Sequence, residues 1–477
     1  MCGSRSLRWM AGMLFLFLVG LAEAACYDPL LFEKHLSSEQ SLVIGQIQVS
    51  GNETTRLQVI MKELPFRSGD TIASDELMRL VELGRQNLLK TSLFNFVYVN
   101  TQSDSLSTVD VSIRVEERWY WWVFPIIEPA DRNVASFFGN GNWDMMNYGA
   151  YVQRDNFRGR QEMLKFRLRV GYANQLAVLF QSPEYKRKTG WGMAVNYNVF
   201  DHLPVFTLND QPVYYKNAGN AVHRYFNASM YLQYRPQLTV RHTLELNVFS
   251  HRVSDTILAL NANFFPHQHS WFDYLTLTYS LGRDVRDSKP YPLSGNYQNF
   301  RLTKAGLGVY EGEPDFWTAR LRINNYWPLK KRFYSSIETM GEVSSQTDLP
   351  YVVKSGLGYR DFLRGYEYYV VDGSITAMAK ANLLFELLPT RVAYWNFIPT
   401  PKFSKIHYAI YLRGFIDNGY VVKQNAHPLN RMVNSHQYGC GLGVDFVTFY
   451  DKVFSFNYAV NRFGEHGFYF HLNLLLE

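Results

Sequence analysis

"MLKFRLRVGY", residues 163–172, places apolar and charged side chains alternately along the chain. Successive side chains of a β-strand point to opposite faces of the sheet, so this alternation predicts a strand with one apolar face and one charged face. The apolar positions are Leu164, Phe166, Leu168 and Val170, and the charged positions are Lys165, Arg167 and Arg169.

The same period of two recurs along the chain after Glu117, for example in "DYLTLTYSLG" (273–282) and "VFSFNYAVN" (453–461). Gly, Asn, Asp and Pro separate these segments, as turns require. The chain is 16% aromatic, and the exposed face of a soluble β-sandwich needs no such excess. A barrel in lipid, by contrast, places apolar residues outward and polar residues toward a wet lumen.

Residues 118–477 are therefore predicted to form a transmembrane antiparallel β-barrel, so that the protein is mostly β. At about 22 residues for a strand with its turn, their length allows about sixteen strands. The last segment, "EHGFYFHLNLLLE" (465–477), also alternates and would close the barrel against its first strand. Tyr120 to Trp122 fit an aromatic belt at the membrane interface, with a buried packing cluster as the alternative.

Residues 1–25 have the pattern of a secretory signal peptide: a positive start, an apolar segment from Met10 to Leu21, and small residues at the cleavage positions. No other run of about eighteen apolar residues occurs, so we expect no transmembrane helix. Residues 26–41 are predicted to be a short linker. Cys26 would permit lipidation, although Glu23 stands where a lipoprotein signal has Leu, and Cys26 with Cys440 gives no disulfide framework.

Residues 42–117 follow a different pattern, strand–helix–helix–strand–strand, which predicts a small α+β domain. The first helix is expected to stop at Pro65 and Gly69, and the second to be capped by Ser74. The five segments are "LVIGQIQVSGNETT" (42–55), "RLQVIMKELPFRSGD" (56–70), "SDELMRLVELGRQNLLKTSLF" (74–94), "FNFVYVNTQ" (94–102) and "TVDVSIRVEE" (108–117).

In order and spacing, these features resemble the bacterial surface antigen superfamily of outer-membrane assembly and translocation barrels. The resemblance implies one periplasmic POTRA domain at 42–117 and an outer-membrane barrel at 118–477. The matching stretches are Gly51-Asn52, Gly69-Asp70, "LLKTSLF" (88–94), "DNFRGRQEMLKF" (155–166), "DVRDSKPYPLSGNY" (284–297) and "FLRGYE" (362–367).

"FLRGYE" resembles the family's signature loop, Val/Ile-Arg-Gly-Phe/Tyr, with Arg364, Gly365 and Tyr366 at the matching positions. The resemblance implies an extracellular loop that folds back into the lumen, where its arginine meets acidic side chains of the inner wall. Two acidic residues are candidates, Asp417 and Glu386. The alternative is an exposed loop arginine between tyrosines.

Both candidates lie in segments that resemble family strands. "GFIDNG" (414–419) is similar to a Phe-x-Asp-x-Gly motif formed by Phe415, Asp417 and Gly419, and "NLLFEL" (382–387) is similar to the strand before it and contains Glu386. Alternation independently places both carboxylates on the inward face, because Ile416 and Leu387 would face lipid.

The terminal segment resembles the insertion signal of barrel clients, a polar-x-Gly-x-x-aromatic-x-hydrophobic pattern. Its last residue, Glu477, departs from the usual aromatic. The matching residues are Glu465, Gly467, Phe470 and Leu472.

The resemblance implies a factor that assembles or inserts outer-membrane proteins. It would bind unfolded outer-membrane or secreted client polypeptides through the edge of its POTRA sheet and through the seam between the first and last barrel strands. Outer-membrane lipid and other assembly subunits are the further expected partners. Three alternatives remain: an exporter of one partner polypeptide, a passive channel, and an accessory barrel that inserts nothing.

Other classes of function are disfavoured. The net charge of +6 is scattered rather than clustered, which argues against nucleic-acid binding. The chain contains no P-loop, no Gly-x-Ser-x-Gly and no His-Glu-x-x-His, so we expect neither an enzyme nor a cofactor. His267 and His269 near Asp273 lack a third positioned ligand, so no metal site is expected.

Overall fold

The computed structural model describes residues 41–103, 107–129, 146–184, 188–217, 220–395, 400–448 and 450–473. The predicted signal peptide and almost all of the predicted linker, with Cys26, lie outside the described residues. None of the helices in these ranges is long and apolar enough to cross a membrane.

The N-terminal domain is a four-stranded sheet in the order β2-β1-β4-β3, covered by two helices. The predicted order of elements is confirmed, with one addition: a three-residue strand, β2, lies between the helices and pairs with β1. The elements are β1 (Ser41–Ser50), α2 (Leu57–Met61), β2 (Thr71–Ala73), α3 (Ser74–Lys90), β3 (Phe94–Ser103) and β4 (Thr108–Glu117).

Two details of the helices differ from expectation. Helix α2 ends at Met61, well before Pro65. Ser74 is the first helical residue rather than the cap, because Ala73 occupies the N-cap position and contributes no side-chain hydrogen bond. Asp75 and Glu76 instead place negative charge in the first turn of α3, where the helix dipole favours it.

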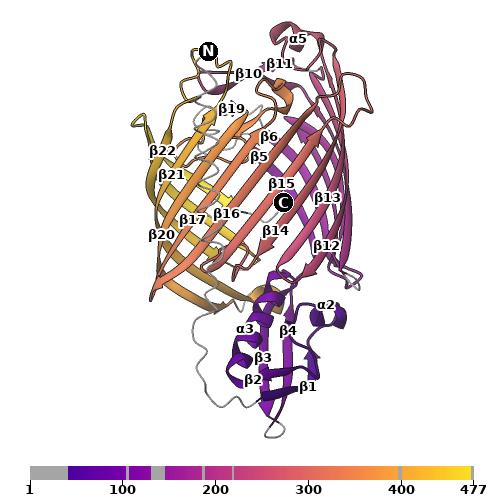
Figure 1. Ribbon diagram of the computed structural model, residues 1–477, viewed down its shortest axis with the longest axis vertical. Coiled ribbons are helices and arrows are strands. Elements are labelled where there is room, and N and C mark those ends of the chain that lie inside the picture. Colours follow the sequence, from indigo (N-terminus) through magenta and orange to yellow (C-terminus); the bar gives the residue numbers. More distant parts are fainter. Residues whose placement is uncertain are drawn as a thin grey trace.

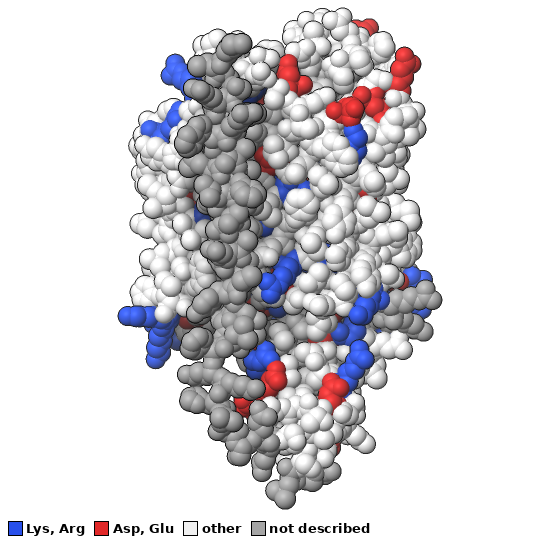
Figure 2. All heavy atoms as spheres, viewed as in Figure 1, with Lys and Arg blue, Asp and Glu red and all other residues white. Residues whose placement is uncertain are grey.

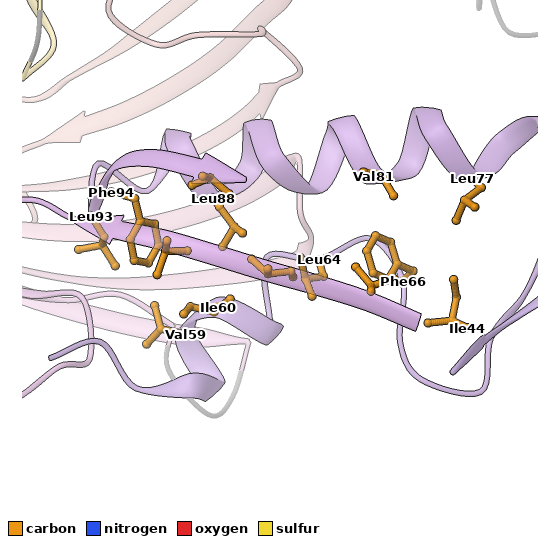
Figure 3. Close-up of a cluster of buried hydrophobic side chains, with 14 of the residues drawn as sticks. Ile44, Val59, Ile60, Leu64, Phe66, Leu77, Val81, Leu88, Leu93 and Phe94 are labelled. Atoms are coloured by element: carbon orange, nitrogen blue, oxygen red, sulfur yellow. The ribbon is translucent and has the colours of Figure 1, made fainter. Parts of the chain in front are cut away.

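A compact apolar core joins the helices to the sheet. Leu77, Val81 and Leu88 lie on one face of α3, at helical spacing, and are buried together with Phe66 and Phe94. Figure 3 shows these side chains between α3, the strands and the short helix α2. This core fixes the angle between α3 and the edge strand β3.

After the N-terminal domain, the described residues contain two small two-stranded sheets and one antiparallel sheet of 16 strands, in agreement with the number estimated from length. Figure 1 shows the strands tilted around a barrel that stands on the N-terminal domain. The strands are β5 (Trp121–Pro129), β6 (Met146–Phe157), β7 (Glu162–Gly171), β8 (Ala173–Ser182), β9 (Thr189–Phe200), β12 (His223–Gln237), β13 (Val240–Val253), β14 (Trp271–Asp284), β15 (Gly295–Ala305), β16 (Phe316–Lys330), β17 (Phe333–Ser344), β20 (Ile375–Tyr394), β21 (Lys405–Val422), β22 (Gln437–Thr448), β23 (Lys452–Asn461) and β24 (His466–Asn473).

The alternation in the sequence separates the outer from the inner face of the barrel. On β24, Phe468 is 78% exposed while its neighbour Tyr469 is 5% exposed. On β7, Phe166, Leu168 and Val170 are exposed while Lys165 is buried. In the view of Figure 2 the middle of the barrel wall is largely uncharged, and charged residues gather toward its two ends. An uncharged, apolar wall is what a lipid-facing barrel requires.

The two ends of the barrel differ. We call the end next to the N-terminal domain the proximal end and the opposite end the distal end. The distal end carries the larger connections, in which buried aromatic residues including Phe264, Phe265 and Phe272 form a second core. These connections contain β10 (His202–Leu208), β11 (Gln211–Lys216), α5 (Asp255–Leu260), η3 (Tyr351–Val353), β18 (Ser355–Leu357) and β19 (Val371–Gly373), whereas α6 (Pro401–Ser404) lies at the proximal end.

Candidate functional site

The long distal loop between β17 and β20 turns back into the barrel. Leu363 is buried against Leu357 of the same loop, Met340 of β17 and Val421 of β21. This apolar contact anchors the "FLRGYE" segment on the inner wall. The predicted position of this segment in the lumen is therefore the observed one, and the exposed-arginine alternative does not hold.

Arg364 and Asp417 form a buried, two-pronged ion pair. The Nε of Arg364 donates to Oδ2 of Asp417 at 2.8 Å, and its Nη2 pairs with Oδ1. The backbone N–H of Arg364 also donates to Oδ2, at 2.9 Å. Asp417 is 0% exposed and Arg364 is 6% exposed. Such a charge-assisted fork fixes both the distance and the orientation of the loop.

Two further side chains complete this pair. The guanidinium carbon of Arg364 lies 3.9 Å from the centroid of the Phe415 ring, a cation–π contact on the same strand as Asp417. Lys380 of β20 lies directly opposite Asp417 in the sheet register. The sequence motif predicts Phe415 at this site but not Lys380, although alternation in β20 places Lys380 on the inner face.

Glu386 is not a partner of Arg364. It lies opposite Tyr411, six residues from Asp417 along β21. At ~3.3 Å per residue this separation is ~20 Å, which an arginine side chain does not bridge. Alternation gives the face of a strand on which a residue lies, but not its height along the barrel, and this is why the sequence offered two candidates.

Three glycines allow the loop to approach the wall closely. Gly365 has φ +89°, a conformation that glycine adopts without strain. A Cβ on Gly439 of β22 would lie 2.4 Å from the carbonyl oxygen of Arg364. Gly439 was not identified from the sequence. At Gly419, from the family motif, a Cβ would meet the Leu363 side chain at 2.7 Å.

Beyond Gly365 the loop contacts the last barrel strands. The hydroxyl of Tyr366 donates to the carbonyl oxygen of Tyr438 at 2.8 Å, and Asn461 Nδ2 donates to the carbonyl oxygen of Gly365 at 3.0 Å. Glu367 accepts from the N–H of Gly365 and lies 3.4 Å from Nε2 of His471 on β24. The loop thus connects β21, β22, β23 and β24, the last four strands before the end of the sheet.

Three terminal motif residues, Gly467, Phe470 and Leu472, lie on β24, the final strand of the sheet, and Glu465 directly precedes it. Phe470 packs on Phe456 of β23 with ring centroids 4.9 Å apart, and Leu472 is exposed on the outer face. Gly467 lies close to the Tyr469 ring. The remaining positions, 474–477, lie outside the described residues.

The first and last strands of the sheet are β5 and β24, and no ladder joins them within residues 121–129 and 466–473. A cavity of about 1390 Å³ fills part of the lumen, lined in large part by residues of β6–β8 and β12–β15, and it also touches Phe124 to Glu128 of β5 and Leu472 of β24. Consecutive strand residues point to opposite faces, so a cavity that touches all of them follows the free edge of the strand. The backbone groups of that edge are available to another strand.

The N-terminal domain also has an open edge. Strand β3 is last in the sheet order, and a groove of about 380 Å³ lies between it and α3. Phe96, which lines the groove, also contacts the barrel: the Nζ of Lys405 on β21 lies 3.7 Å from the centroid of its ring. The groove is lined by Arg85 and Leu89 from α3, with residues 95–100 from β3.

Ion pairs and hydrogen bonds dock the N-terminal domain onto the proximal end. Arg118 makes two hydrogen bonds to Asp451 in the β22–β23 turn, at 2.6 and 3.0 Å. Tyr120 belongs to the core of the N-terminal domain and donates to the carbonyl oxygen of Leu93 at 2.9 Å. The alternative of a buried cluster therefore holds for Tyr120, whereas Trp121 is exposed as a membrane belt requires.

Glu63 and Arg235 form the most enclosed ion pair of this docking surface, at 2.7 and 2.9 Å. Burial alone would raise the pKa of Glu63, but the hydrogen-bonded guanidinium of Arg235 outweighs burial and holds that pKa below its usual value of 4.5. The pair therefore stabilises the docked state while Glu63 is ionised.

This pair predicts an acid-sensitive contribution to stability. The contribution is complete above about pH 4.5, the unfolded value, and is lost as the pH falls through the lowered folded pKa. Wild type and Glu63→Gln should therefore differ in thermal midpoint at pH 7 and converge toward pH 3. Exposed Glu53→Gln is the control, expected to match wild type throughout. A constant gap between Glu63→Gln and wild type across this range would show that ionisation of Glu63 contributes nothing.

The histidine pair at the distal end shows no third ligand. Asp273 is bound instead to Arg252, at 2.6 and 2.8 Å. Within the described ranges no group of three or more His, Cys, Asp or Glu side chains could hold a metal ion.

Comparison with known proteins agrees with this architecture. Residues 156–474 match the model of the Omp85 superfamily domain, and residues 42–118 match the POTRA model, surface antigen variable number repeat. No curated protein sequence matches the chain.

Solved structures of similar fold include two named CdiB. That from Escherichia coli has a TM-score of 0.56 at 11% identity, over 90% of this chain and 76% of the other. That from Acinetobacter baumannii has a TM-score of 0.51 at 12% identity, over 91% and 74%. BamA from Haemophilus ducreyi lacking POTRA domains 1–3 has a TM-score of 0.48 at 14% identity, over 90% and 84%. The Omp85 model spans more than half of the chain, and this protein, a single POTRA domain followed by a 16-stranded barrel, belongs to the Omp85 superfamily.

Proposed function

We propose that this protein inserts client polypeptides into the outer membrane, with its POTRA domain in the periplasm and its distal loops at the cell surface. Membership of the superfamily carries the coarser statement that it is an outer-membrane protein of assembly or translocation. The observation that carries the finer proposal is the free edge of β5, which borders a large lumenal cavity. Such an edge can pair with the strand of an unfolded client while the client leaves toward lipid.

The POTRA domain would receive the client first. An extended polypeptide can add to the edge of β3, where backbone hydrogen bonds give affinity that tolerates many sequences. Phe96 in the groove beside β3 contacts Lys405 of the barrel, so a bound segment would lie close to the proximal rim. The docking contacts of Arg118 and Glu63 hold the domain in that position.

The Arg364 loop has a supporting role in this proposal. It holds together β21 to β24, the strands on one side of the seam, through contacts from the lumen. The edge of β24 can then move relative to β5 without collapse of the wall behind it. Arg364, Gly365, Tyr366 and Asp417 are accordingly structural residues of the lumen and not catalytic ones.

Site-specific photo-crosslinking tests the proposal. A photoreactive amino acid at Ile127, on the free strand β5, should capture newly made barrel proteins in growing cells. The control position is Leu246 on β13, which is also outward-facing but is paired on both sides. We expect several-fold more client at 127 than at 246, and mass spectrometry should identify many barrel proteins.

Two outcomes would contradict insertion. Capture of one secreted polypeptide at 127, with no barrel proteins, would indicate an exporter. Equal capture at 127 and 246 would leave the free edge without a role and favour a channel or an accessory barrel.

A further inference from the structure

The proximal connection between β14 and β15, residues 285–294, is a turn ordered by internal hydrogen bonds. The Oδ1 of Asp287 accepts hydrogen bonds from the N–H groups of Ser288, Leu293 and Ser294, at 2.8, 3.1 and 3.2 Å. Pro290 and Pro292 flank Tyr291, and each fixes its own φ. The turn therefore presents Tyr291 from a rigid frame.

Tyr291 reaches across part of the lumen to strands β21 and β22. Its hydroxyl donates to Oδ2 of Asp445 on β22 at 2.8 Å, and its ring lies 4.9 Å from that of Tyr411 on β21. In the sheet order β16, β17 and β20 separate the strands that carry the turn from those that receive it. The contact therefore crosses part of the lumen.

The residues that contact the Tyr291 hydroxyl form a buried polar cluster. Asp445 is 0% exposed and pairs with Nη2 of Arg413 at 3.0 Å. The same Nη2 donates to Oδ1 of Asn457 on β23 at 2.9 Å. The guanidinium of Arg413 lies 6.0 Å from the Phe415 ring, which also contacts Arg364. The two loops, one from each end of the barrel, thus meet neighbouring residues of β21.

The other side of the turn faces the POTRA domain. Lys289 lines a cavity of about 190 Å³ at the junction, together with Glu63 and Lys90 of the POTRA domain and Arg235 of β12. A movement of the POTRA domain at this junction would displace charges directly around Lys289.

We propose that residues 285–294 form a second lumenal lock, entered from the POTRA side, in which Asp445 and Arg413 are positioning residues for Tyr291. The lumen is then narrowed from both ends: the Arg364 loop enters the distal half and the Tyr291 turn crosses the proximal half, beside the large cavity that borders β5. This narrowing does not depend on the proposed function. Its release by a client that moved the turn out of the lumen would depend on it.

Single-channel recording of the full-length protein in planar bilayers tests the lock without any client. Tyr291→Phe removes one hydroxyl and keeps the ring, so the fold should persist while long openings become several-fold more frequent. Asp445→Asn should act in the same direction, and the double variant should exceed neither single variant by much, because both remove one contact. Tyr310→Phe, an exposed tyrosine in the distal connection between β15 and β16, should behave as wild type.

The thermal midpoint, measured on the same preparations, distinguishes a gating role of Tyr291 from a role in stability alone. We expect Tyr291→Phe to change gating with little change in midpoint. Wild-type gating in both Tyr291→Phe and Asp445→Asn would overturn the second lock. Because the recording contains no client, that result would leave the insertion proposal standing, and failure of the crosslinking at position 127 would leave the lock standing.

Discussion

Arg364→Ala should destabilise the barrel by roughly 3–5 kcal/mol, less where lumenal water reaches the site. The reason is the position of its partner: Asp417 is 0% exposed, and without the guanidinium its charge keeps only the backbone N–H of residue 364 and the cation of Lys380 across the sheet. Asp417→Ala should be similarly costly, because it leaves the buried charge of Arg364 without its carboxylate partner, beside the Phe415 ring. Unfolding in denaturant, followed by heat-modifiable migration in a gel, measures both.

The double variant gives the sharper result. Arg364→Ala with Asp417→Ala should lose clearly less than the sum of the two single losses, because the second substitution removes a charge that the first has already left uncompensated. The matched control is Arg252→Ala, which breaks an arginine–aspartate fork of the same barrel whose arginine side chain is 46% exposed. That control should cost about 1 kcal/mol or less. Strict additivity of the 364 and 417 losses would show that their ion pair does not stabilise the barrel.

How much of this site the sequence reveals depends on which physical rule each residue obeys. Alternation along β21 places Asp417 inward and Ile416 outward, and the structure agrees because each face meets a different solvent. The number of strands follows from length for a similar reason, since the thickness of the membrane sets the average length of a strand with its turn. The first rule needs only the sequence of one strand, and the second needs only the length of the chain.

What the sequence did not reveal is set by contacts between distant segments. Glu386 and Asp417 obey the same alternation, and only the register between β20 and β21 shows that they lie at different heights. The link from Tyr291 to Asp445 joins positions 154 residues apart. The "DVRDSKPYPLSGNY" stretch was noticed for its family likeness, but nothing in its pattern says that its turn points into the lumen rather than away from it.

Gly439 is a further case, because a strand glycine can mark a bulge, a tight bend or a close approach of another backbone. Here the approach is explicit: a Cβ at this position would lie 2.4 Å from the carbonyl oxygen of Arg364, which is backbone and cannot rotate aside. Gly439→Ala should therefore push the loop off the wall and lengthen the contacts between Arg364 and Asp417. We expect a loss of stability of about 1–3 kcal/mol, as for overpacking elsewhere, together with more frequent channel opening.

A second strand glycine isolates the steric cause of this effect. Gly341 of β17 has no atom within 4 Å of an added Cβ, so Gly341→Ala should leave both stability and gating close to wild type. Gly439→Ser should resemble Gly439→Ala, because the first added atom already causes the clash. If Gly439→Ala and Gly341→Ala were indistinguishable in bilayer recordings and in thermal midpoint, the loop would have to shift freely along β22. The Arg364–Asp417 pair would then be a flexible tether, and the resistance of the distal lumen to ion flow would have to come from the apolar contact of Leu363 with Met340 and Val421.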